Sequence, residues 1–275
     1  MGKTKIAWTD KVWNPLTGCA KVGPGCVNCY AERMAKRLKA MGRPEYLDAV
    51  DDRGRWTGKI TLIPERLNDP LKWRKPAYVF VNSMSDLFHD EVPSSFINRM
   101  VEIMQKANRH VYQILTKRYS RPGVVLNQQD ASDHILIGFS VSNQDDADKA
   151  WESVRAVSMM GWRTWVSYEP ALGKVDWSGW EFIDQLVCGG ESGPRARMMH
   201  PDWVRSARDQ CQANNIPFFF KQWGEWVPLD HLPWVTDSTT FATCPIEMDG
   251  AWMCRVGKGM AGHVLDGREW RGMPK

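Results

Sequence analysis

Residues 78–93 read YVFVNSMSDLFHDEVP, in which a short apolar run passes directly into a polar loop. A continuous apolar run of this length is typical of a strand that is buried on both faces of a parallel sheet. We therefore expect a strand over residues 78–82, followed by a helix over about 94–108. The polar residues from Asn82 to Asp86 then lie at the carboxyl end of that strand.

The same pattern recurs along most of the chain. Further apolar strands are expected at 6–13, 110–115, 135–141, 164–168, 185–190 and 217–222, and further helices at 31–41, 145–159 and 201–214. Alternating strands and helices predict parallel strands joined by crossover helices. Seven such strands indicate an α/β fold, a full or partial (β/α) barrel over residues 1–222. Residues 45–76 are expected to form an irregular connection, and residues 223–275 a small C-terminal extension that packs on the barrel.

Composition narrows the class of protein. The 275 residues are 43% hydrophobic and 25% charged, which is ordinary for a soluble enzyme. No apolar run approaches the roughly 18 residues of a membrane span, and no apolar segment follows the first lysines as in a secretory signal. We expect a cytoplasmic protein with no membrane partner, whose seven cysteines are reduced thiols or metal ligands. A net charge of +4 permits a nucleic-acid partner without requiring one.

Three of the cysteines are concentrated in residues 13–32, WNPLTGCAKVGPGCVNCYAE, just before the first predicted helix. A structural zinc site normally has four ligands, but Cys188, Cys211, Cys244 and Cys254 form no second CxxC pair. A zinc ion completed by a remote residue, or three thiols without a metal, remain alternatives. A [4Fe–4S] cluster is usually held by four thiolates, so three would leave one iron open to a substrate or cofactor. The adjoining helix N-terminus would favour an anionic cluster.

The spacing Cys19-x6-Cys26-x2-Cys29, followed by Tyr30, resembles the cluster loop of the radical S-adenosylmethionine superfamily. The usual pattern there is Cys-x3-Cys-x2-Cys, so the first gap is a longer variant. The segment WNPxxGC…GCxxCYAE is similar to a phage- and prophage-borne branch that is distantly similar to spore photoproduct lyase. The resemblance covers about residues 6–222. For a phage-encoded member, it implies a location in the cytoplasm of the bacterial host.

The resemblance implies a cofactor set and candidate residues for binding it. Cys19, Cys26 and Cys29 would bind three irons of a [4Fe–4S] cluster, and S-adenosyl-L-methionine would chelate the fourth. A low-potential electron donor of the flavodoxin or ferredoxin type would reduce the cluster, and cleavage of the sulfonium would give a 5′-deoxyadenosyl radical that abstracts hydrogen from the substrate. The candidate cofactor-binding residues are Tyr30, Ser83, Ser85, Asp86, Lys117, Ser140, Ser142, Glu169 and Glu191.

Two further features concern the substrate and an auxiliary group. Cys188 is a candidate catalytic hydrogen donor, although a cysteine within an apolar strand is more often simply buried. Cys244 and Cys254 give only a weak indication of a second cluster. A nucleic acid or nucleotide substrate is suggested by the basic residues of the first predicted helix, by the pair Arg195 and Arg197, and by the many tryptophans. The alternative is that the helix face is simply solvated and the tryptophans belong to the core.

The phage association of this branch and its distant similarity to spore photoproduct lyase favour a DNA base as substrate. The reaction would then belong to phage DNA hypermodification, for example the rearrangement of a thymine substituent. Two other classes of function stay open. One is a radical enzyme that acts on a peptide or small metabolite. The other is a non-catalytic iron–sulfur or zinc module that binds nucleic acid. The reductant, the reaction subtype and the fate of S-adenosylmethionine have no signature in the sequence.

Overall fold

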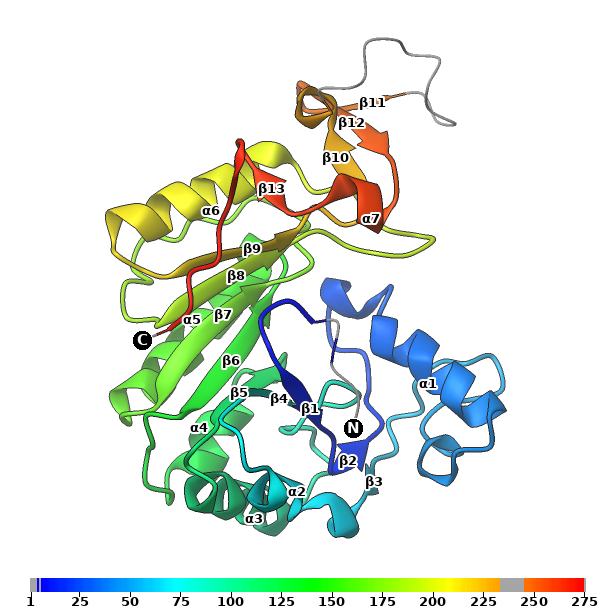
Figure 1. Cartoon of the computed structure of the whole chain (residues 1–275), viewed down its shortest axis with the longest axis vertical. Helices are drawn as coiled ribbons and strands as arrows, with labels where there is room; N and C mark the ends of the chain where they lie inside the picture. Colours follow the sequence, from blue (N-terminus) through cyan, green and yellow to red (C-terminus); the bar gives the residue numbers. More distant parts are fainter. Residues whose placement is uncertain (1–3, 5, 233–244, 275) are drawn as a thin grey trace. The chain divides into compact units, whose positions relative to one another are not determined.

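The computed structural model describes residues 4, 6–232 and 245–274, drawn in Figure 1. Seven strands form one sheet in the order β1-β4-β5-β6-β7-β8-β9. Their bounds are β1 Lys11–Trp13, β4 Tyr78–Val81, β5 Val111–Thr116, β6 Ile135–Val141, β7 Arg163–Tyr168, β8 Gln185–Gly189 and β9 Phe218–Gln222. Within the described residues, β1 and β9 each have one neighbour, so the sheet is open. The predicted α/β fold is confirmed in its partial-barrel form, with all seven strands present.

The parallel register brings the carboxyl ends of neighbouring strands to the same edge. The pairs β1–β4, β4–β5, β5–β6 and β8–β9 are parallel. Val81 at the end of β4 is paired with Trp13 at the end of β1 and with Ile114 in β5. The loops that follow these three strands therefore begin close together, which is where ligands bind in sheets of this kind.

The first strand is shorter than predicted, since β1 begins at Lys11 rather than at residue 6. The hydroxyl of Thr9 donates to the carbonyls of Lys11, at 3.1 Å, and Tyr78, at 2.9 Å. The carboxylate of Asp10 accepts the backbone N–H of Tyr78 at 2.8 Å. The Asp10 carboxylate thus takes the Tyr78 N–H that a backbone carbonyl of a longer β1 would have used, while the Tyr78 carbonyl still accepts the Asp10 N–H at 3.0 Å.

The four long predicted helices are confirmed, each within two residues of its expected start. They are α1 Tyr30–Ala40, α3 Ser94–Lys106, α5 Gln144–Met159 and α6 Pro201–Ala213. The short helices α2 Asp69–Lys72, α4 Arg121–Leu126 and α7 Lys258–Ala261 were not expected. The sequence of α4, RPGVVL, explains the omission, because its proline and glycine are weak helix formers in an interior. Proline is nevertheless tolerated here because it lies in the first turn.

The connection over 45–76 is more ordered than predicted. Within it, β3 Thr61–Leu62 pairs antiparallel with β2 Leu16–Thr17, and 3₁₀ turns cover Pro44–Tyr46 and Pro64–Arg66. The indole of Trp13 donates to the carbonyl of Arg66 at 2.8 Å. The connection therefore supports the residues that precede the first cysteine.

The centre of the sheet is closely packed. Every residue of β6 is buried, and a Cβ at Gly138 would lie 2.3 Å from the indole of Trp165. That indole donates to the carbonyl of Ile114 at 3.1 Å. Glycine is needed at this position because Trp165 occupies the space of its missing side chain.

The chain divides into two compact units, residues 1–139 with 150–165, and residues 140–149 with 166–275. The expected boundary between residues 222 and 223 stays a prediction. The C-terminal segment contains an antiparallel sheet of β10 Trp226–Pro228, β12 Ala251–Arg255 and β11 Ile246–Met248, and a pair formed by β13 Val264–Leu265 and β14 Arg268–Glu269. Cys244 lies outside the described residues. None of the helices described is long and apolar enough to span a bilayer.

Candidate functional site at the cysteine loop

The loop that carries the three cysteines begins at a position that only glycine fits well. Gly18 has φ of +96°, and a Cβ there would lie 2.1 Å from the carbonyl oxygen of Lys59. The next residue, Cys19, accepts a hydrogen bond at its carbonyl from the N–H of Gly58, at 3.2 Å. The backbone of Cys19 is thus held against the connection over 45–76.

The carboxylate of Glu32 links α1 to the cysteine loop and to the connection over residues 45–76. Glu32 in α1 is 8% exposed and forms an ion pair with Lys21 at 2.7 Å. Its other oxygen accepts the N–H of Trp56 at 2.9 Å. Lys21 also donates to the carbonyl of Val27 at 3.2 Å, so one ammonium group bridges the loop and the helix.

The second and third cysteines are set by helical turns. Cys26 ends a 3₁₀ turn, Pro24–Cys26, and Cys29 is the N-cap of α1. Cys29 packs against the core cluster that contains Ala31, Ala35 and Met84. Its position at a helix N-terminus places the positive end of the helix dipole beside the thiol.

The three thiols line one cavity of about 130 Å³ in the first unit. Eight of the residues expected to form a site line it together: Cys19, Cys26, Cys29, Tyr30, Ser83, Ser85, Asp86 and Lys117. The lining also includes residues that the sequence analysis did not select, among them Trp56, Phe80, Asn82, Thr116 and Arg118. The roles of all these residues are proposals, but their common location is a feature of the fold.

The three thiols form no disulfide within the described residues. Cys19, Cys26 and Cys29 are all free and partly buried. Burial, and then the nearby Asp86 carboxylate, raise the pKa of the Cys19 thiol to about 12. Across the described ranges, no three His, Cys, Asp or Glu side chains are grouped closely enough to hold one metal ion. The case for a cluster therefore rests on donor chemistry: three free thiols on one cavity are soft ligands suited to iron–sulfur clusters or zinc.

Asp86 has its carboxylate fully engaged by protein donors. It accepts hydrogen bonds from the Thr116 hydroxyl at 2.8 Å, the Phe88 N–H at 2.9 Å and the Lys117 N–H at 3.3 Å. It also forms an ion pair with Arg118 at 3.0 Å, in which each side chain is 8% exposed. Asp86 thus fixes the start of the loop after β5 and orients the Arg118 guanidinium, which lines the cavity.

The aromatic ring and the serines are anchored to neighbouring backbone. The Tyr30 hydroxyl donates to the carbonyl of Ser83 at 2.7 Å. The Ser83 hydroxyl is 3.3 Å from the Asn14 amide, and the Ser85 hydroxyl donates to the carbonyl of Leu16 at 3.2 Å. These bonds hold the β4 loop against the cysteine loop.

Asn82 directly follows β4 and lines the cavity, but it was not among the residues expected to form the site. It is 3% exposed and has φ of +62°, a left-handed conformation that asparagine tolerates better than most residues. Neither polar atom of its buried amide has a partner within the described structure. An amide left unpaired on a cavity wall is costly unless a ligand or water completes it. The cavity therefore fits a polar ligand.

The remaining expected residues belong to the second unit. The Ser140 hydroxyl donates to the carbonyl of Glu169 at 3.1 Å, and Ser142 is fully buried. Glu169 forms an ion pair with Lys221 at 2.9 Å, with side chains 13% and 23% exposed. These groups follow strand ends as expected, but their part in cofactor binding stays a prediction.

Glu191 and Cys188 have more restricted surroundings. Glu191 accepts from the Arg197 guanidinium at 2.6 Å and from the Arg197 N–H at 2.9 Å. This pair holds the loop after β8 closed on itself and occupies one of the two arginines considered for phosphate binding.

Cys188 has no exposed surface, and burial holds the pKa of its thiol well above the usual value. Its role as a hydrogen donor stays a prediction.

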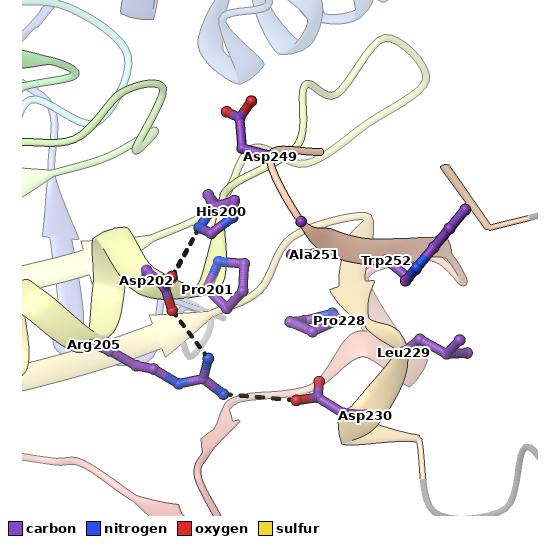
Figure 2. Close-up of a pocket in the computed structure, with 11 residues that line it drawn as sticks. His200, Pro201, Asp202, Arg205, Pro228, Leu229, Asp230, Asp249, Ala251 and Trp252 are labelled. Carbon is purple, nitrogen blue, oxygen red and sulfur yellow. Dashed lines mark hydrogen bonds and ion pairs between the residues drawn. The ribbon is translucent and has the colours of Figure 1, made fainter. Parts of the chain in front are cut away.

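A larger cavity of about 520 Å³ lies in the second unit, between α6 and the small C-terminal sheet. Figure 2 shows Arg205 reaching between Asp202 and Asp230, at 3.3 and 3.9 Å. Arg205 also pairs with Asp266 at 2.9 Å. Arg205 faces three carboxylates here, and Asp202 and Asp230 are each less than a third buried. We therefore take the smaller cavity, which the three cysteines line, as the candidate site.

A family model described as "Protein of unknown function (DUF5131)" matches residues 3–274. The chain belongs to this family. No curated protein matches the sequence. Among solved structures, a cysteine-to-serine mutant of spore photoproduct lyase is similar, with 13% identity and a TM-score of 0.48. That alignment covers 94% of this chain and 71% of the other.

Proposed function

We propose that this member of the DUF5131 family is a radical S-adenosylmethionine enzyme. The observation that carries the proposal is that Cys19, Cys26 and Cys29, all free thiols, line one cavity with Tyr30 and the loops after β4 and β5. Three thiolates leave a [4Fe–4S] cluster with one iron that no protein ligand occupies. The motif resemblance in the cysteine loop supports the same reading.

In this proposal the three cysteines hold the cluster, and the cluster with S-adenosylmethionine supplies one-electron reductive cleavage of a carbon–sulfur bond. The protein's own part is to bind and orient. Lys117 and Arg118 offer cations for a carboxylate, the unpaired amide of Asn82 offers a donor and an acceptor, and the hydroxyl bond from Tyr30 to Ser83 fixes the plane of an aromatic ring.

We extend the proposal to a nucleic acid or nucleotide as substrate, most concretely a modified DNA base, in keeping with the phage-borne branch of the superfamily that the cysteine loop resembles. Support comes from the aromatic side chains of Tyr30, Trp56 and Phe80 on the cavity, because bases stack on such rings. The positive net charge of +4 is compatible with phosphate binding. A peptide or small metabolite is the competing substrate class, and it would require no affinity for DNA.

The test is anaerobic reconstitution with iron and sulfide, followed by reduction with dithionite in the presence of S-adenosylmethionine. We expect about four irons per chain and formation of 5′-deoxyadenosine. The variant Cys26→Ala should lose both, whereas Cys211→Ala, which removes a buried thiol from α6, should retain both. Stoichiometric zinc without cleavage would contradict the proposal and leave the cysteines as a structural clip in a binding protein.

A further inference from the structure

One face of α1 carries large exposed side chains, beginning next to the third cysteine. Tyr30, Met34 and Met41 are 53%, 43% and 62% exposed. Arg33 and Arg37 are also exposed, three and seven residues after Tyr30. Side chains spaced by three, four and seven positions share a helix face. These five residues are called the α1 stripe below.

The opposite face of α1 fixes the orientation of the stripe. Ala31 and Ala35 are buried and belong to one core cluster with Tyr46, Ala49 and Val50. The helix therefore cannot turn to bury its methionines without losing this packing. The large side chains of Tyr30, Met34 and Met41 therefore stay exposed to water, which is unfavourable for their apolar surface. Such an exposed apolar patch is typical of a surface that binds a partner.

The composition of the stripe favours a protein over a nucleic acid. Protein interfaces are enriched in tyrosine, methionine and arginine, and their strongest contacts often involve tyrosine and arginine. Surfaces that bind DNA are more polar and rely on cations along the phosphate backbone. Met34 and Met41 have no polar group to offer a phosphate. Val22 and Val27 on the cysteine loop, 50% and 55% exposed, add further apolar surface near the start of the helix.

The charges of α1 specify the kind of protein. Arg33, Lys36 and Arg37 are exposed, while the helix's single acid, Glu32, is buried and paired with Lys21 at 2.7 Å. Among the residues of α1 itself, the charged side chains on the outer face are therefore all cations. A surface of this kind is complementary to a partner with an acidic rim, because opposite potentials steer and orient the encounter.

The position of the stripe indicates what the partner delivers. Tyr30 belongs both to the stripe and to the lining of the cavity that holds the three thiols. We propose that the α1 stripe is the docking surface for an acidic electron-transfer protein that delivers single electrons to the cysteine site. The inference rests on the proposed function. In each transfer the redox group of the partner is oxidised by one electron, the cluster is reduced by one, and no covalent bond changes.

The test measures binding of a bacterial flavodoxin, an acidic FMN protein, to the reconstituted full-length chain at low salt. The double variant Met34→Glu/Arg37→Glu should weaken binding at least about tenfold, equivalent to about 1.4 kcal/mol. Met34→Leu, which keeps the apolar surface, should bind like the wild type. Met159→Glu makes the same methionine-to-glutamate change at a 78% exposed position at the end of α5 and should also leave binding unchanged. Added salt should weaken wild-type binding.

A second readout separates docking from chemistry. Dithionite needs no docking surface, so the double variant should be reduced by dithionite and cleave S-adenosylmethionine like the wild type, while reduction by flavodoxin slows at least about tenfold, in line with the weakened binding. Unchanged flavodoxin binding in the double variant, or no binding by the wild type, overturns the inference. If the double variant loses binding of duplex DNA but still binds flavodoxin, the inference is also overturned, and the α1 stripe is a nucleic-acid surface instead. Failure of dithionite-driven cleavage in the wild type counts against the proposed function instead.

Discussion

Asp86 and Arg118 form a buried ion pair of 3.0 Å on the wall of the cavity that the three cysteines line. Neither side chain is more than 8% exposed. The pair joins the loop after β4 to the loop after β5, and it keeps a guanidinium at the cavity in a fixed orientation. A buried pair of this kind is costly to break, because the remaining charge has no solvent to replace its partner.

Removal of Asp86 should therefore destabilise the protein strongly. We expect Asp86→Ala to lower the free energy of unfolding by about 3–5 kcal/mol. Asp90→Ala is the matched control, since Asp90 is 81% exposed and 3.8 Å from the same guanidinium, and should cost less than about 1 kcal/mol. Urea denaturation of the metal-free protein measures both. A cost for Asp86→Ala that equals that of Asp90→Ala would show that the pair contributes little.

The turn before Cys19 can be tested with two glycines in similar conformations. Gly18 and Gly58 have φ of +96° and +86°, but only Gly18 would place a Cβ against backbone, at 2.1 Å from the Lys59 oxygen. Gly58→Ala should cost about 1 kcal/mol for the left-handed conformation alone. Gly18→Ala should cost clearly more and should reduce iron incorporation, because the loop must move. Thermal unfolding and iron content measure the two effects, and equal losses in both variants would contradict the steric argument.

The Cys19 thiol should be unusually unreactive in the folded, metal-free protein. Burial raises its pKa from 9.0 to about 12, and only the thiolate attacks alkylating reagents. Alkylation at pH 8 should be slower in the folded than in the urea-unfolded chain, and should accelerate as the pH approaches 12. Because the folded pKa is the higher one, the group's contribution to stability is complete below pH 9 and is lost as the pH rises towards 12. Peptide-resolved mass spectrometry measures the rates, and equal rates in both states would refute the shift.

Most strands could be predicted from the sequence because they are largely apolar, and β6 is buried at every residue. The cysteines and the loop after β4 could be selected because they follow strand ends, where a parallel sheet gathers its polar groups. A residue's position at a strand end does not reveal which other side chain it contacts in the folded protein. Glu191 follows β8 as predicted, yet its carboxylate is held by Arg197, six residues away, through a loop with no regular pattern.

Arg118 and Asn82 were not selected for a related reason. Arg118 is one of many arginines in the sequence, and its interest comes from burial against Asp86, 32 residues earlier. Asn82 was noted as a polar residue at a strand end, but its unpaired amide and left-handed backbone exist only in the folded chain. Contacts between residues distant in sequence therefore decide the site beyond its cysteines.

Asn82 provides the most direct test of ligand binding in the cavity. Replacement by glycine preserves φ of +62° without strain and removes two buried atoms that have no protein partner. We expect Asn82→Gly to change the free energy of unfolding of the ligand-free protein by no more than about 1 kcal/mol. If the amide binds a charged group of S-adenosylmethionine, affinity for it should fall by roughly 1.5–3 kcal/mol, or at least about tenfold. Calorimetry on the reconstituted protein measures the affinity.

Asn215 supplies the matched control for this substitution. It has φ of +56° but is exposed at the end of α6, so Asn215→Gly makes the same chemical change in nearly the same backbone conformation outside the lining of the cavity. Affinity for S-adenosylmethionine should be unaffected in this variant. An Asn82→Gly protein that binds as tightly as Asn215→Gly would mean that water, rather than the cofactor, completes the Asn82 amide. The polar contacts of the ligand would then come from other groups on the cavity wall, among them Lys117 and Arg118, which follow β5.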